Sequence, residues 1–148
     1  MQSASKSHHF LGVNDNGMAS IVNTTGNPDG HIVLRGGSKG PNFESQHVQR
    51  ISAELKQFNL PHKVMIDCSH GNSNKDFRKQ AEVLKNIASQ LSNGEKNILG
   101  VMLESHLKEG NQKLLKKEDL DFGRSITDAC IDIDTTKELL STLYNSLN

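Results

Sequence analysis

Four short apolar segments constrain the fold of this chain more than any other feature of its sequence. They span residues 9–13, 31–34, 63–67 and 97–103, and each is rich in Val, Ile, Leu or Met. Within each segment the apolar residues are continuous instead of alternating with polar ones, which is typical of strands covered on both faces. The pattern therefore predicts four parallel β-strands.

Helical periodicity fills most of the gaps between these segments. One apolar helix face precedes Pro61, and a second precedes Asn93-Gly94, which is a good helix terminator. A last helix is predicted near the C-terminus, with Asp134 or Thr135 as its N-cap. The residues expected to face inward are Val48, Ile51, Leu55 and Phe58 in the first helix, Phe77, Ala81, Leu84, Ile87, Ala88 and Leu91 in the second, and Leu139, Leu140, Leu143 and Leu147 in the third.

The order of these elements defines the fold class. Strand, helix and strand alternate, which implies right-handed crossovers and an α/β fold, while residues 13–31 fit either a hairpin strand at 18–22 or one short helix. At 148 residues we expect a single domain over residues 1–148. Four strands cannot close an eight-stranded barrel of about 250 residues, so the sheet is either open or part of a larger barrel.

Charge and composition exclude two classes of partner. The chain has 17 Lys and Arg against 17 Asp and Glu, whereas nucleic-acid and membrane-surface binding require a basic excess. No segment reaches the ~18 apolar residues of a membrane span, and residues 1–10 lack the apolar core of a signal peptide. We therefore expect a cytoplasmic protein in which Cys68 and Cys130 are free, buried thiols.

Polar clusters follow the predicted strands at the points where the strands end. Because the carboxyl ends of parallel strands meet at one edge of a sheet, His70, Glu104 and Asp128 are expected to converge there. One imidazole and two carboxylates suit a divalent cation such as Mn²⁺, Fe²⁺, Co²⁺ or Zn²⁺. The alternative is a histidine at the rim of the sheet with two solvated acids.

Arg35 ends the second apolar segment and is followed by Gly36 and Gly37. A guanidinium beside two glycines, whose backbone N–H groups can approach a ligand closely, predicts a cradle for phosphate or carboxylate. The alternative is a surface ion pair with the two glycines merely turning the chain. Lys75 and Arg78 could add positive potential here, but we expect them on a solvated helix face.

Two other chemistries near His70 are less well supported by the sequence. Cys68 could pair with His70 as a metal ligand, but cysteine is often simply a small buried apolar residue. Ser69 and Ser73 could act as nucleophiles, but no Gly-x-Ser-x-Gly elbow or oxyanion-donor motif accompanies them.

Several motifs occur together in one order along the chain. They are LRGG at residues 34–37, MIDCSHGNSNK at 65–75, GVMLESH at 100–106, EGNQ at 109–112 and SITDAC at 125–130. In this combination the chain resembles the C-terminal half of class I 3-deoxy-D-arabino-heptulosonate 7-phosphate (DAHP) synthases, and the resemblance covers essentially all 148 residues.

The resemblance implies a fold, a reaction and roles for particular residues. The family fold is a (β/α)₈ barrel, of which this chain would supply the last four strands and the closing helix. Family members are transferases that condense phosphoenolpyruvate with erythrose 4-phosphate and water, giving DAHP and phosphate in the first step of the shikimate pathway to aromatic amino acids. By motif, His70, Glu104 and Asp128 match three of the four metal ligands, and Arg35 matches an arginine that holds phosphoenolpyruvate.

The chain also departs from the family pattern. The family's fourth metal ligand, a cysteine, its other phosphoenolpyruvate contacts and its Lys-Pro-Arg-Thr loop all precede the matching segment, and none occurs here. Cys68 replaces a usual aromatic residue, and Asp132-Ile133 replaces a common Gly-Trp.

These departures predict that the isolated chain has no synthase activity and that it is a piece of a longer enzyme, self-associates, or needs a separate N-terminal half. The remaining alternatives are a non-catalytic remnant that binds metal and anions, and the related 3-deoxy-octulosonate 8-phosphate synthase.

Overall fold

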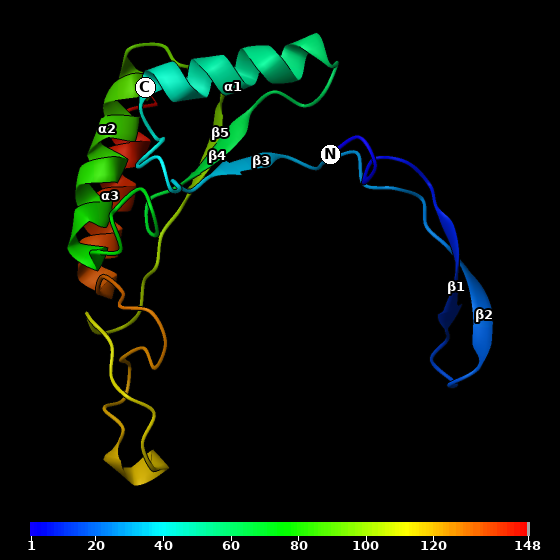
Figure 1. Cartoon of the computed structure of the whole chain (residues 1–148). Coiled ribbons are helices and arrows are strands. Elements are labelled where there is room, and N and C mark those ends of the chain that lie inside the picture. The colour runs from blue at the N-terminus through cyan, green and yellow to red at the C-terminus, as the bar shows by residue number, and fades with distance from the viewer. Residues whose placement is uncertain (148) are drawn as a thin grey trace.

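The computed structural model describes residues 1–147 (Figure 1). Two short 3₁₀ turns lie at Phe77–Lys79 and Lys117–Asp119. The strands and helices follow in the order β1 (His9–Val13), β2 (Ala19–Asn23), β3 (Ile32–Leu34), α1 (Ser45–Gln57), β4 (Val64–Asp67), α2 (Gln80–Ser92), β5 (Ile98–Met102) and α3 (Ile133–Asn145).

The centre of the molecule is a parallel sheet in the order β3-β4-β5. Strand β4 lies in the middle, with Leu34 of β3 and Val101 of β5 both opposite Ile66. Helix α1 connects β3 to β4, and α2 connects β4 to β5, as expected for crossovers between parallel strands. The predicted α/β fold with a parallel sheet is therefore confirmed.

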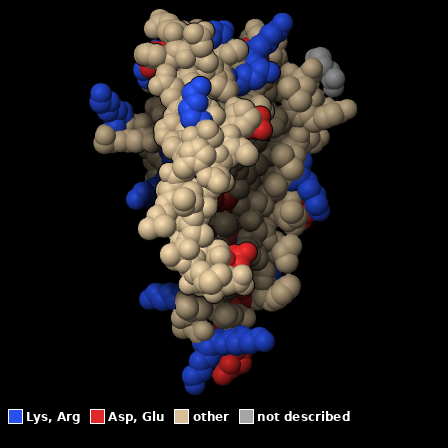
Figure 2. Space-filling model, turned by 90° about the vertical axis from the view of Figure 1, so that its right-hand side faces the viewer, with Lys and Arg blue, Asp and Glu red and all other residues tan. Residues whose placement is uncertain are grey.

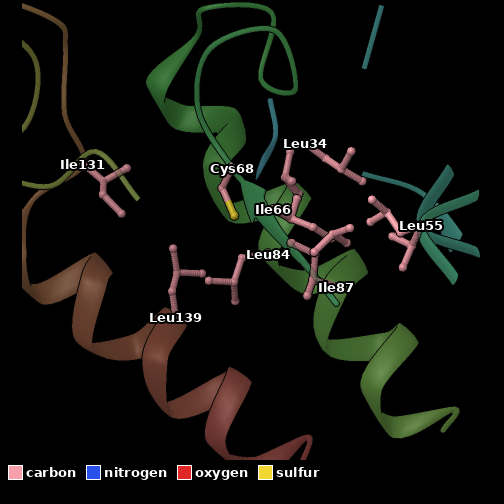
Figure 3. Packing of buried hydrophobic residues seen from close by; sticks show 11 residues of the cluster. Leu34, Leu55, Ile66, Cys68, Leu84, Ile87, Ile131 and Leu139 are labelled. Carbon is pink, nitrogen blue, oxygen red and sulfur yellow. The ribbon is translucent and has the colours of Figure 1, made fainter. Parts of the chain in front are cut away.

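The helices pack on one face of this sheet. Val64, Ile66 and Cys68 are fully buried and contact apolar side chains from α1, α2 and α3 (Figure 3). Side chains alternate along a strand, so Met65 lies on the opposite face, which no helix covers among the described residues. The expectation that every strand is covered on both faces is thus only half right.

The first apolar segment does not join the parallel sheet. It forms β1, which pairs antiparallel with β2 in a separate two-stranded hairpin, so the prediction of four parallel strands was wrong at this position. Only residues 14–18 link the two strands, and a parallel crossover needs a dozen residues or more. The ambiguous segment at residues 18–22 is accordingly a hairpin strand.

At the β5 edge of the parallel sheet, only an isolated bridge continues the parallel pairing. A single bridge joins Ser105, just beyond β5, to Ile131, and this is the nearest feature to a fourth parallel strand. The sheet therefore has three strands in the described chain, and the outer edges of β3 and β5 lie open.

The predicted helices are present, with three local differences. Phe58 is the C-terminal cap of α1 and is exposed instead of facing inward. Leu139 is buried in α3, but Leu140 and Leu147 are exposed. The N-cap of α3 is Asp132, whose side chain accepts a hydrogen bond from the Thr135 backbone N–H, and not Asp134 or Thr135.

The hairpin projects away from the sheet and its helices at the end of a long connection (Figure 1). Seen from the side of the hairpin, Lys and Arg side chains are scattered and do not form one patch (Figure 2). Among residues 1–147, no helix has the length and apolar character needed to span a bilayer.

Candidate metal centre

The loop after β4 carries the histidine of the predicted metal site. This loop leaves the strand at Asp67 and turns sharply, with His70 at a positive φ of 49°. Asn72, which is buried, stabilises the turn because its amide Nδ2 donates to the carbonyl oxygens of Leu34 (3.0 Å) and Asp67 (2.7 Å). The ends of β3 and β4 are therefore joined beneath the loop.

Asp67 fixes the orientation of the His70 ring. The Asp67 side chain is fully buried, and its Oδ2 lies 2.7 Å from His70 Nδ1. Its other oxygen, Oδ1, accepts hydrogen bonds from the backbone N–H and hydroxyl of Ser69. When Nδ1–H donates a hydrogen bond to Asp67, the lone pair of Nε2 is free to bind a cation. This arrangement is common for metal-bound histidines.

Glu104 and Asp128 approach the free side of this ring. Glu104 lies two residues after β5, and its Oε1 is 3.4 Å from His70 Nε2. Asp128 comes from the segment before α3. One ligand atom from each of His70, Glu104 and Asp128 lies within 4.8 Å of the other two, and this is the one group of potential metal ligands found among residues 1–147.

The three side chains line a cavity of about 230 Å³. Lys75 and Phe77 also line it. Lys75 was predicted on a solvated helix face, but its side chain also faces this cavity. Lys75 precedes the 3₁₀ turn and has a positive φ of 62°.

Negative charge gathers in this cavity. Burial raises the pKa of Glu104, and the nearby carboxylates of Asp128 and Asp67 raise it further, while His70 and Arg35 oppose the change. The ionised form of Glu104 is thus disfavoured while no cation balances it. The residue types and their electrostatics together fit a divalent cation held by one nitrogen and two oxygens.

Arg35, directly after β3, approaches the same Asp67 oxygen that His70 contacts. Its Nε is 3.6 Å from Asp67 Oδ2, and slightly over half of its side chain (56%) is exposed. The guanidinium is therefore held at one end and open to a ligand at the other.

The backbone N–H groups of the two following glycines do not form the predicted anion cradle. Gly36 N–H donates to Asn42 Oδ1 (2.8 Å), and Gly37 N–H donates to the Gly40 carbonyl (3.0 Å). Gly36 has a φ of 71°, and a Cβ there would lie 2.5 Å from the carbonyl carbon of Gly71. The glycine at 36 thus permits close contact between two loops, and the guanidinium of Arg35 is the remaining anion-binding group.

The two cysteines are buried, as predicted. Burial, together with the adjacent Asp67 carboxylate, raises the pKa of the Cys68 thiol to about 12. Cys68 points toward the helices, packs in the core and does not belong to the ligand group.

The sequence did not predict the residues that hydrogen-bond to the candidate ligands or to the loops carrying them. Asp67 lies within the motif at residues 65–75, and its position three residues before His70 is a usable signal for their contact. Asn72 and Gln80, a buried glutamine that contacts the backbone of Glu104, gave no recognisable signal because their partners are far away in the sequence.

Comparisons with known proteins match nearly the whole chain. Two Escherichia coli K12 proteins, Tyr-sensitive and Phe-sensitive phospho-2-dehydro-3-deoxyheptonate aldolases, are 42% and 49% identical over 149 and 147 residues. A tyrosine-inhibited aldolase of the same name from Schizosaccharomyces pombe is 47% identical over 144 residues. The matches cover 100%, 99% and 95% of this chain but only 42%, 42% and 39% of the relatives, so the chain spans about two fifths of their length.

A solved structure extends this similarity to three dimensions. The phospho-2-dehydro-3-deoxyheptonate aldolase of Francisella tularensis superimposes with a TM-score of 0.92 at 46% identity, covering 99% of this chain and 42% of that one. The model of the DAHP synthetase I family matches residues 1–141. By sequence, by structure and by the motifs around the candidate metal centre, this chain belongs to the DAHP synthetase I family.

Proposed function

We propose that this chain supplies the metal centre and one anion-binding arginine of a 3-deoxy-7-phosphoheptulonate synthase. That enzyme joins phosphoenolpyruvate, erythrose 4-phosphate and water to give DAHP and phosphate. The observation that carries the proposal is the convergence of His70, Glu104 and Asp128, from three separate segments, within 4.8 Å. Membership of the family and the names of the relatives support the choice of reaction.

His70, Glu104 and Asp128 would hold the divalent cation through Nε2 and two carboxylate oxygens. This donor set fits Mn²⁺, Fe²⁺, Co²⁺ or Zn²⁺, and the three ligands of this chain leave coordination positions open for the family's fourth ligand and for substrate. The bound cation supplies Lewis acidity that polarises the aldehyde of erythrose 4-phosphate. Asp67 would keep the His70 ring oriented through the contact between its Oδ2 and Nδ1.

Arg35 would bind the phosphate or carboxylate of phosphoenolpyruvate. Its contact with buried Asp67 places the guanidinium next to the histidine ligand, and its exposed end can donate two parallel hydrogen bonds to an anion. The two substrates would then be held side by side, which favours the bond-forming step by proximity.

The rest of the active site would come from a second polypeptide region. We propose that residues 1–148 form one partial domain, the C-terminal half of a (β/α)₈ barrel. The open edges of β3 and β5 and the uncovered face of the sheet support this arrangement, as does the fit to 42% of the Francisella protein. Either a further copy of the chain or an N-terminal half would complete the barrel. The free thiols Cys68 and Cys130 are consistent with the cytoplasm.

Isothermal titration of the chain with Mn²⁺ tests the metal centre. We expect saturable binding that is lost in His70→Ala and retained in His9→Ala, which changes an exposed histidine of the hairpin. Binding that survives His70→Ala would contradict the ligand assignment.

A second experiment tests the reaction. We expect no phosphate release from phosphoenolpyruvate and erythrose 4-phosphate by the chain alone, and turnover when the N-terminal part of the Phe-sensitive relative is added. Full turnover by the isolated chain would contradict the partial-domain proposal. Mn²⁺ binding without turnover in the mixture would favour a non-catalytic remnant, and turnover with arabinose 5-phosphate instead would favour the octulosonate enzyme.

A further inference from the structure

Gln80 is a fully buried polar side chain at the first position of α2. Both ends of its amide bind the backbone of a single residue on another segment. Its Nε2 donates to the Glu104 carbonyl oxygen (3.1 Å), and its Oε1 accepts from the Glu104 N–H (2.8 Å). Because burying an unpaired amide is costly, this two-point contact strongly favours one position of Glu104 relative to the helix.

The same carbonyl oxygen is shared with a third segment. The backbone N–H of Ile131 donates to Glu104 O (3.0 Å), and Ile131 O accepts from the N–H of His106 (3.0 Å). Ile131 lies three residues after Asp128. The Glu104 carbonyl is therefore the point at which α2, the end of β5 and the Asp128 segment meet.

The helix that carries Gln80 is also connected to the histidine. Residues 71–79 run from His70 through the 3₁₀ turn Phe77–Lys79 directly into α2, so Gln80 anchors the C-terminal end of the His70 loop. Each of the three segments that bear a candidate ligand is thus joined, directly or through one backbone hydrogen bond, to this one side chain.

We propose that Gln80 is a positioning residue for the metal centre, holding the Glu104 backbone so that its carboxylate meets His70 and Asp128. This inference rests on the proposed function and deepens it. Gln80 does not line the cavity, and both of its hydrogen-bonding groups bind the Glu104 backbone. Its effect on the cation is transmitted through the position of Glu104.

Gln90 provides a matched control on the same helix. It is also buried, and its Nε2 donates to the carbonyl of Phe43 (2.8 Å) and to Asn86 Oδ1 (2.8 Å), so it too ties α2 to a distant segment. That segment precedes α1 and carries none of the candidate ligands. Substituting either glutamine removes buried hydrogen bonds, but only one of the two substitutions releases Glu104.

The test compares Gln80→Met and Gln90→Met in the full 148-residue chain. Methionine has a similar shape and volume but cannot form the amide hydrogen bonds. Mn²⁺ affinity is measured by isothermal titration, the absorption spectrum of added Co²⁺ reports the geometry of its ligands, and urea unfolding reports stability. We expect Gln80→Met to weaken Mn²⁺ binding by about 10- to 100-fold and to change the Co²⁺ spectrum, as for other residues that support metal ligands. Gln90→Met should leave both within about twofold of wild type. It should lose less stability than Gln80→Met, because Gln90 Oε1 is buried with no hydrogen-bond partner among the described residues.

Each outcome decides the matter. Equal Mn²⁺ affinity in Gln80→Met and wild type, or equal weakening in both variants, overturns the positioning role but leaves the proposed metal centre intact. Absence of Mn²⁺ binding in the wild-type chain overturns the metal centre and this inference with it. If Gln80→Met does not fold, Gln80→Asn replaces it, since the shorter amide cannot span both contacts; wild-type affinity in that variant also overturns the inference.

Discussion

The β1–β2 hairpin and the β3–β4–β5 sheet are built from similarly apolar strands. The apolar side chains of the hairpin are mostly exposed, whereas those of the central strand of the sheet are buried. Ile66 of β4 is completely inaccessible to solvent, whereas Ile21 of β2 is 72% exposed. The difference lies in the connection after each strand. An amphipathic helix comes after β3 and after β4 and covers the sheet, while a five-residue turn comes after β1 and returns the chain antiparallel without any cover. An apolar segment therefore indicates a strand, and the connection determines whether it is buried.

The largest expected effect comes from deleting buried volume on each side of this comparison. Ile66→Ala should lower the free energy of unfolding by about 2–5 kcal/mol because it removes core contacts and leaves a cavity. Ile21→Ala should change it by less than about 0.5 kcal/mol. Urea unfolding followed by circular dichroism measures both, and similar losses would show that the hairpin is packed against something in solution.

Two glycines with positive φ give the next largest effect. Gly36→Ala should cost more than the roughly 1–2 kcal/mol of left-handed strain, because its Cβ also collides with the backbone of Gly71. Gly17→Ala in the hairpin turn has the same strain, at φ 76°, but open space around the new methyl group. The urea midpoint should therefore fall further for Gly36→Ala, and equal midpoints would contradict the close contact between the two loops.

A smaller effect follows from the Cys68 thiol, whose pKa is raised to about 12 by burial. Between about pH 9 and pH 12 the unfolded chain loses this proton and the folded chain keeps it, so stability should fall as the pH rises. The free energy of unfolding, measured with urea, should fall more between about pH 8 and about pH 10.5 in wild type than in Cys68→Ala. In thiol labelling of the folded chain, Cys68 should stay unmodified while an Ala19→Cys variant, on the exposed hairpin, reacts at once.

The smallest effect concerns two side chains that cap local structure. Asp132 accepts from the Thr135 N–H at the start of α3, which holds the pKa of its carboxyl below its usual range. The stabilisation of the fold by the ionised Asp132 carboxylate is therefore fully present above the ordinary pKa of aspartate. It is lost as the pH falls through the lowered pKa of Asp132. Asp132→Ala should lower the melting temperature by a few degrees at neutral pH and by less in acid.

The hairpin supplies the counterpart to this cap. Asn14 Oδ1 accepts from the N–H groups of Asn16 and Met18 and closes the β1–β2 turn. Asn14→Ala should lower the melting temperature by less than Asp132→Ala, since the hairpin contributes little to the core. A melting temperature lowered as much as in Asp132→Ala would show that the hairpin and the sheet unfold together.

The sequence predicted most of the sheet and its helices because helix faces and buried strands leave periodic patterns. It failed where the partner of a segment was decided by connection length, as for β1, and where a helix face was left without a neighbour, as at Leu140. The candidate ligands His70, Glu104 and Asp128 could be chosen because strand ends converge and because the family motifs are distinctive. Gln80 could not, since a glutamine that binds the backbone 24 residues away leaves no mark on local sequence.

The contact between Gly36 and Gly71 has a consequence for how this protein can change over time. Each residue already has the smallest side chain available, and each would place a Cβ within 3.0 Å of the other's backbone. A larger residue at one position cannot be compensated by a smaller residue at the other, because both are already glycine. Single substitutions therefore cannot lead to another pair of residues that packs equally well. The loops bearing Arg35 and His70 are thereby held in a fixed relation that mutation can destroy but not gradually adjust.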